Sequence, residues 1–138
     1  MNLNIFCEQV LKPKITKSLI ISIATSMATD ENVAFADINI IFCSDDYLLE
    51  INKQYLQHDY YTDIITFDYK DNNLISSDIF ISVDRLKDNA QTLQISFDSE
   101  LKRIIIHGLL HLCGYEDDTT EKRSNMSLKE DYYLSQIK

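Results

Sequence analysis

Residues 96–114 read SFDSELKRIIIHGLLHLCG and predict one long helix. Ser96 is a favoured N-cap residue, and Asp98 and Glu100 suit the first turn because the helix dipole favours negative charge there. The second half of the segment is apolar almost all round, which is typical of a buried helix. Gly114 is placed to end the helix in the left-handed conformation that glycine adopts readily. We therefore expect the rest of the chain to pack around this helix.

The flanking sequence predicts about four strands and four more helices. Alternating apolar residues indicate the strands, and an apolar residue at every fourth position indicates an amphipathic helix that begins near Pro13. Asp118 and Glu121 resemble a capping pair for the last helix. The predicted strands are residues 3–7, 37–43, 63–69 and 78–83, and the predicted helices are residues 13–27, 44–55, 83–93 and 118–137.

These elements predict an α+β fold. A small mixed sheet of about four strands would pack against the buried central helix, with the further helices around it. The inner face of the last helix is predicted to carry Met126, Tyr133, Leu134 and Ile137. A chain of 138 residues suits one domain, so we expect residues 1–138 to form a single unit.

The composition excludes several classes of protein. The formal net charge is −9, which argues against a protein that coats nucleic acid by bulk charge. Any nucleic-acid binding would need a local basic groove or a metal ion. Residues 1–8 lack the features of an export signal, and the apolar stretches are shorter than a membrane span. Three widely spaced cysteines fit a reducing cytosol, so we expect a cytoplasmic protein with no membrane partner.

The end of the central helix carries a metal-binding pattern. His107 and His111 are one helical turn apart, so both imidazoles project from one face at a spacing that one ion can bridge. Gly114 lets the chain turn back, and Asp117 follows three residues later. The spacing H-x-x-x-H-x-x-G-x-x-D matches that of metzincin-type three-ligand zinc sites, except that this chain lacks the Glu that follows the first His in those sites. These ligand types predict a single Zn²⁺ ion.

Simpler interpretations of the same residues remain open. A buried histidine is more often a hydrogen-bonded core residue than a metal ligand, although two of them at this spacing are costly to bury. Asp117 could instead cap the last helix, in which case Asp118 or Glu116 would complete the site.

The segment from His107 to Asp117 resembles the signature of the YbeY family, H-G-x-L-H-L-x-G-Y-D-H. The likeness extends over most of the chain. Glu100 stands seven residues before the first histidine, as it does in the family, and Met126 fits a methionine beyond the signature. Three upstream blocks are also similar to family blocks, namely Asn52–Tyr55, Thr62–Phe67 and Asp78–Ile81.

The resemblance implies a bacterial metal-dependent endoribonuclease of ribosomal RNA maturation. The implied substrate is single-stranded RNA, with rRNA precursors and ribosomal particles as partners, and no DNA is expected. The implied role is maturation of the 16S rRNA 3′ end and ribosome quality control. His107, His111 and Asp117 would be both the metal ligands and the catalytic residues.

Two positions depart from the family pattern. Asp117 stands in place of the third histidine, and its added negative charge should make the metal a weaker Lewis acid. Leu56 stands in place of an arginine that is associated with phosphate binding or catalysis in the family. A substitute would have to come from one of the other basic residues, which are Arg85, Arg103, Arg123 or a lysine such as Lys53.

We therefore expect metal-assisted hydrolysis of phosphodiester bonds, with water or a ribose 2′-hydroxyl as the nucleophile. A zinc protease is a second hypothesis, but Gly108 stands where such enzymes carry their glutamate base. A third hypothesis is a ribosome-assembly factor whose metal is mainly structural. The acidity of the chain and the leucine at position 56 both favour it somewhat.

Overall fold

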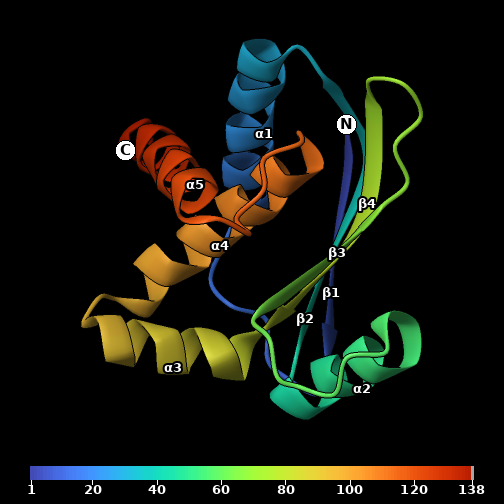
Figure 1. Ribbon diagram of the computed structural model, residues 1–138, viewed down its shortest axis with the longest axis vertical. Helices are drawn as coiled ribbons and strands as arrows, with labels where there is room; N and C mark the ends of the chain where they lie inside the picture. Colours follow the sequence, from blue (N-terminus) through green and yellow to red (C-terminus); the bar gives the residue numbers. More distant parts are fainter. Residues whose placement is uncertain (138) are drawn as a thin grey trace.

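The computed structural model describes residues 1–137 and has a four-stranded sheet with five helices (Figure 1). The strands are β1 (Asn2–Glu8), β2 (Ala34–Cys43), β3 (Ile64–Asp68) and β4 (Leu74–Ser82). The helices are α1 (Lys17–Glu31), α2 (Asp45–Leu56), α3 (Val83–Leu93), α4 (Phe97–Leu112) and α5 (Thr120–Ser135). The predicted α+β fold, with a small mixed sheet against a central helix, is confirmed.

The sheet has the strand order β1-β2-β4-β3. β1 pairs in parallel with β2, and β2 pairs in parallel with β4, whereas β3 runs antiparallel to β4. Figure 1 shows α1, α4 and α5 on one side of the sheet, with α2 at its lower end. The main core lies between the sheet and α1, α4 and α5, and a smaller cluster under α2 includes Cys43, Leu48 and Ile65.

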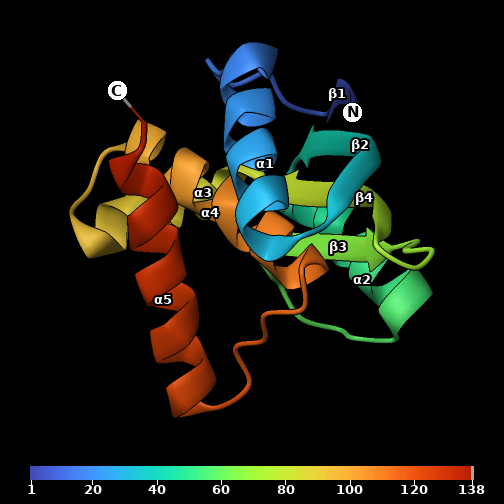
Figure 2. The ribbon, with the colours of Figure 1, turned by 90° about the horizontal axis from the view of Figure 1, so that it is seen from above.

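Helix α4 is the buried centre that the sequence predicts. The Ser96 side chain accepts a hydrogen bond from the backbone N–H of Ser99, which caps the helix as expected. Gly108 allows α4 to lie close to the sheet, because a Cβ at this position would stand 2.8 Å from Ile64 Cδ1 on β3. Helix α4 ends at Leu112, and Gly114 follows with a φ of 106°. Seen from above, α4 crosses the sheet and leads into the loop before α5 (Figure 2).

Four predicted boundaries are wrong, namely the starts of α1, α5, β2 and β4. Helix α1 begins at Lys17 rather than near Pro13, because the Thr16 side chain caps it by accepting from the Leu19 N–H. Helix α5 is capped by Thr119, which accepts from the Lys122 N–H, and not by Asp118. Strands β2 and β4 both start earlier than predicted, since Ala34 and Phe35 pair with Leu74 and Ile75.

The inner face of α5 is as predicted. Met126 and Tyr133 are buried in the main core, and Leu134 and Ile137 are half-buried against it. Helix α5 therefore packs against the rest of the protein and lies next to α4. None of the helices in residues 1–137 combines the length and the apolar character that crossing a membrane requires.

Candidate metal site

One stripe of α4 faces α5 and carries three polar side chains at intervals of one helical turn. They are Arg103, His107 and His111. The turn at Gly114 sends the following loop back along this stripe, where Asp117 meets both rings. Asp117 Oδ2 lies 3.4 Å from His107 Nε2 and 3.6 Å from His111 Nε2. The three side chains singled out in the sequence are thus brought together.

The donor set has the size and chemistry that a divalent ion needs. Two ligand atoms about 2.0–2.1 Å from one ion at the tetrahedral angle lie about 3.3 Å apart. The two measured distances to Asp117 Oδ2 are close to this value, and one ligand atom from each of the three residues lies within 4.8 Å of the others. Among residues 1–137 this is the only such group of histidine, cysteine or acidic side chains. The residues therefore fit a zinc-type ion with one coordination position left for another ligand.

The neighbouring acids, which the sequence left as alternatives to Asp117, are bound elsewhere. Glu116 Oε2 accepts from Lys122 Nζ at 2.6 Å, and Asp118 Oδ1 lies 3.3 Å from the same nitrogen. Asp117 does not cap α5, because Thr119 does. Of the three consecutive acids, Asp117 is the one beside the histidines.

Glu130 on α5 is a site residue that the sequence analysis missed. Its side chain is buried, with 6% of the residue exposed, and its Oε2 lies 2.6 Å from His107 Nδ1. An ionised carboxylate only accepts, so Nδ1–H is the donor, and in the neutral ring this leaves the Nε2 lone pair facing Asp117 and the candidate metal position. Arg103 Nη1 donates to the other oxygen of Glu130 at 2.8 Å, and Arg103 Nη2 donates to Asp131 at 2.7 Å.

A signal for Glu130 was present in the sequence. It lies four residues after Met126 and three before Tyr133, on the face of α5 predicted to be buried. An acidic residue on a buried helix face needs a hydrogen-bonding partner, so its position predicts a polar group on the helix opposite. The sequence did not show which helix that would be.

The same carboxylates set the pKa of His107. Burial alone lowers the pKa of this imidazole, but the hydrogen bond and charge of Glu130 raise it, as do the nearby carboxylates of Asp117 and Asp63. The net effect is a pKa above the ordinary value for histidine. The surroundings of His107 therefore favour positive charge at this point, whether from a proton or from a metal ion.

Position 108 does not contribute to the site. A side chain there would point at Ile64, Thr66 and Ile79 of the sheet. A glutamate at this position, the base of H-E-x-x-H proteases, has no room beside β3. The geometry therefore argues against peptide hydrolysis by that mechanism.

The upstream blocks shape the segment between α2 and β3. Asn52 is buried, and its Nδ2 donates to the carbonyl of Tyr60 at 2.9 Å, which anchors this loop. Asp63 Oδ2 accepts from Asn89 Nδ2 at 3.2 Å, and burial raises the pKa of Asp63. Leu56 is 40% exposed at the end of α2. Lys53 lies 3.6 Å from both Glu50 and Asp59, so its charge is already paired.

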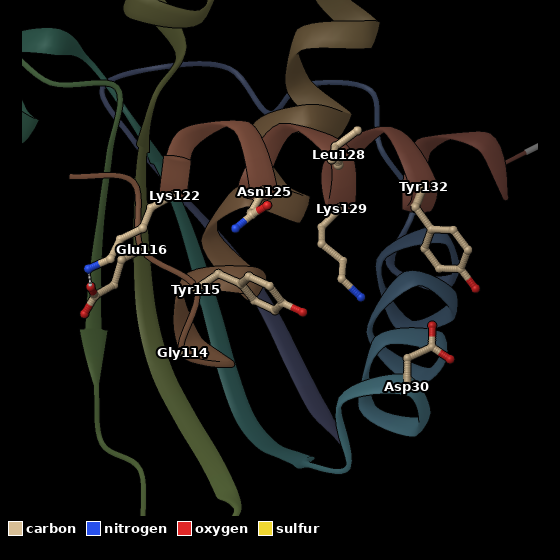
Figure 3. Close-up of a pocket in the computed structure, with 9 residues that line it drawn as sticks. All are labelled: Asp30, Gly114, Tyr115, Glu116, Lys122, Asn125, Leu128, Lys129 and Tyr132. Atoms are coloured by element: carbon tan, nitrogen blue, oxygen red, sulfur yellow. Dashed lines mark hydrogen bonds and ion pairs between the residues drawn. The ribbon is translucent and has the colours of Figure 1, made fainter. Parts of the chain in front are cut away.

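A cavity of about 620 Å³ lies between α5, the loop before it and Asp30 of α1 (Figure 3). His107, His111 and Asp117 do not line it. Tyr115 and Tyr132 line it, together with Gly114, Glu116, Lys122, Asn125, Leu128 and Lys129. Lys129 lies 3.4 Å from Glu31, and Lys122 is held by Glu116, so both ammonium groups are already paired.

Comparison with known proteins identifies the family. Residues 6–138 match the family model described as "Endoribonuclease YbeY". Proteins named endoribonuclease YbeY include one from Parabacteroides distasonis, 45% identical over 94% of this chain and 92% of its own length. Another, from Cytophaga hutchinsonii, is 51% identical over 80% of this chain and 78% of its own length.

A solved structure has the same fold. The solution structure of TM1509 from Thermotoga maritima aligns with a TM-score of 0.60 and 24% identity, over 95% of this chain and 87% of that one. The α+β architecture described above is therefore found in an experimental structure. From its match over nearly the full length and its similarity to these relatives, the chain belongs to the YbeY endoribonuclease family.

Proposed function

We propose that this protein is a metal-dependent endoribonuclease that hydrolyses phosphodiester bonds of single-stranded RNA. His107, His111 and Asp117 would hold a single zinc ion and would form the catalytic site. The observation that supports this most directly is the convergence of these three side chains at spacings suited to one ion, in a chain of the YbeY family. Zinc is favoured by the two imidazoles and one carboxylate.

Each residue of the candidate site has a definite role in this proposal. Glu130 accepts from His107 Nδ1–H and so aims Nε2 at the ion. Arg103 holds Glu130 in place and offsets its charge inside the protein. His111 and Asp117 supply the other two ligand atoms from the end of α4 and the loop that follows it. The bound ion would supply Lewis acidity, which activates water and offsets charge on a phosphoryl oxygen.

The proposed cellular role is based on membership of the YbeY family. We infer that the substrates are ribosomal RNA precursors, and that the protein acts in the cytoplasm on ribosomal particles, in 16S rRNA 3′-end maturation and ribosome quality control. DNA is not an expected substrate. Because the net charge is −9, RNA binding should depend on a few local contacts at the site and not on the overall charge of the protein.

The test uses matched variants of adjacent residues. His111→Ala and Asp117→Ala each remove a proposed ligand, whereas Asp118→Ala removes only an exposed partner of Lys122. Zinc content after purification without added metal, and cleavage of a single-stranded RNA, should both fall in the first two variants. The fall in cleavage should exceed the roughly 10- to 100-fold cost of losing an outer hydrogen-bond partner. Asp118→Ala should keep both properties.

The same proteins separate the alternative functions. Casein cleavage that depends on His111 would indicate a protease and refute the proposal. A chelator that melts the fold while the wild-type protein shows no RNA cleavage would indicate a structural metal in an assembly factor. A nuclease should lose RNA cleavage on chelation before it loses its folded structure.

A further inference from the structure

The three arginines of the chain differ in how their charge is used. Arg85 lies 2.7 Å from Asp45 and 3.6 Å from Asp88. Arg103 likewise contacts two carboxylates, those of Glu130 and Asp131. Within residues 1–137, Arg123 is the one arginine with no carboxylate at ion-pair distance. Its charge is therefore available to a ligand.

Arg123 also lies beside the candidate metal site. It stands in the first turn of α5, and its Nη1 donates to the backbone carbonyl of Asp117 at 3.4 Å. Its Nη2 donates to Thr120 Oγ1 at 3.3 Å. Both contacts are long, and both are to neutral oxygens, so the guanidinium keeps three of its five N–H groups unused and its charge unpaired.

Two other cations near the site are already paired with carboxylates. Arg103 is held by Glu130 and Asp131, and Lys122 is held by Glu116 and Asp118. An RNA phosphate that approaches Asp117 therefore meets several carboxylates and one uncommitted guanidinium. Without that guanidinium, the negative charge of the site would oppose the negative charge of the substrate.

We propose that Arg123 binds a phosphodiester of the RNA strand at the metal site and so positions the strand for cleavage. This inference rests on the proposed nuclease function. A guanidinium presents its N–H groups as a planar fork that can pair with two oxygens of one phosphate. The contact with the Asp117 carbonyl keeps the side chain next to the ligand loop before RNA arrives.

A purely structural role for Arg123 makes a different prediction. If the side chain serves only to hold the Asp117 loop, its removal should weaken zinc binding and lower the melting temperature together. If it binds phosphate, zinc affinity and melting temperature should stay nearly unchanged, because its two contacts within the protein are long and exposed to solvent. RNA binding should fall in either case, so zinc affinity is the measurement that separates the two roles.

The first experiment measures binding of a labelled single-stranded oligoribonucleotide to the zinc-loaded protein, under conditions in which the RNA stays uncut. Arg123→Ala should weaken binding by about tenfold or more, since charged hydrogen bonds are lost. The slope of log affinity against log salt should become shallower by about 0.7, the value for one phosphate contact on a single strand. Lys14→Ala is the control, because Lys14 lines a cavity with Asp98, which is in the first turn at the opposite end of α4.

The second experiment locates the contact. Single methylphosphonate linkages, which lack the phosphate charge, are placed one at a time along the RNA. A methylphosphonate at the linkage that Arg123 contacts should weaken RNA binding to the wild-type protein. The same substitution should not weaken RNA binding to Arg123→Ala any further. Arg123→Lys should keep the salt slope and recover only part of the affinity, since lysine lacks the fork.

The assignment would be overturned if Arg123→Ala bound RNA with the affinity and salt slope of the wild type, or if it lost zinc affinity together with RNA affinity. It would also be overturned if every methylphosphonate linkage weakened RNA binding as much in Arg123→Ala as in the wild type. A wild-type protein that neither binds nor cuts single-stranded RNA would instead refute the proposed function, on which this inference rests. The two failures are therefore distinguishable.

Discussion

Replacement of Glu130 by glutamine tests whether the hydrogen bond to His107 sets the metal affinity. The substitution keeps the shape of the side chain but gives it one acceptor and one donor end. Arg103 is a permanent donor, so the amide should turn its oxygen toward Arg103 and its NH₂ toward His107 Nδ1. Nδ1 must then accept, and the ring proton moves to Nε2, the nitrogen that faces Asp117. The variant therefore favours the tautomer that cannot bind a metal through Nε2.

The size of the effect follows from that change of tautomer. Loss of an outer partner of a metal-bound histidine costs about 10- to 100-fold in metal affinity, or about 1.4–2.7 kcal/mol. Glu130 is buried and only 2.6 Å from Nδ1, so we expect Glu130→Gln to lie in the upper half of this range. Asp131→Asn is the matched control. It removes the second carboxylate that pairs with Arg103. The Asp131 side chain is 62% exposed, so its loss should change zinc affinity by less than about twofold.

Competition with a chromophoric chelator would give the zinc affinities, and nitrogen NMR of the metal-free proteins would report the tautomer of His107. A Glu130→Gln protein that is folded and binds zinc within about twofold of wild type would refute the reasoning. Equal losses in the glutamine and asparagine variants would refute it too, because a general change in charge would then explain both.

Three further predictions concern stability and thiol reactivity. Gly108→Glu should lower the melting temperature by several degrees, because a Cβ at this position already meets Ile64 and the rest of the side chain would have to displace Thr66 or Ile79 of the sheet; an unchanged melting temperature would contradict this. Burial and nearby acids raise the pKa of Glu100, so its ionisation at neutral pH opposes folding. Glu100→Gln should thus raise the free energy of unfolding at pH 7, with the gain disappearing near pH 4, and an equal gain at both pH values would exclude a titration origin. A thiol reagent should modify exposed Cys7 first, partly buried Cys113 much more slowly and buried Cys43 only after unfolding, since burial raises the pKa of Cys43 and Cys113 to about 12; mass spectrometry would give this order, and early modification of Cys43 would contradict it.

Local signals in the sequence were sufficient to predict the central helix and its two ends. The Ser96 cap, the apolar run and Gly114 act within a few residues of one another, so their effect can be read without knowledge of the fold. The approach of Asp117 to the histidines is also local, because one turn and a short loop bring it there.

The missed features depend on contacts between distant segments. Glu130 follows His107 by 23 residues and meets it only because α5 packs against the polar stripe of α4. The early start of β4 arises from pairing with β2 about 40 residues upstream. The Pro13 error was of another kind. Pro13 suited a helix start, but Thr16 supplied the hydrogen bond that fixes it.

The place of Glu130 in the chain has a consequence for protein synthesis. A nascent chain in which α5 is still within the ribosomal exit tunnel already carries both imidazoles and Asp117, but it lacks the buried acid that directs His107. Full affinity for a metal ion would then be reached only when α5 docks, so the proposed nuclease would be less active while it is still attached to the ribosome that makes it. Zinc titration of chains arrested before and after residue 130 has emerged would show whether affinity rises at that step.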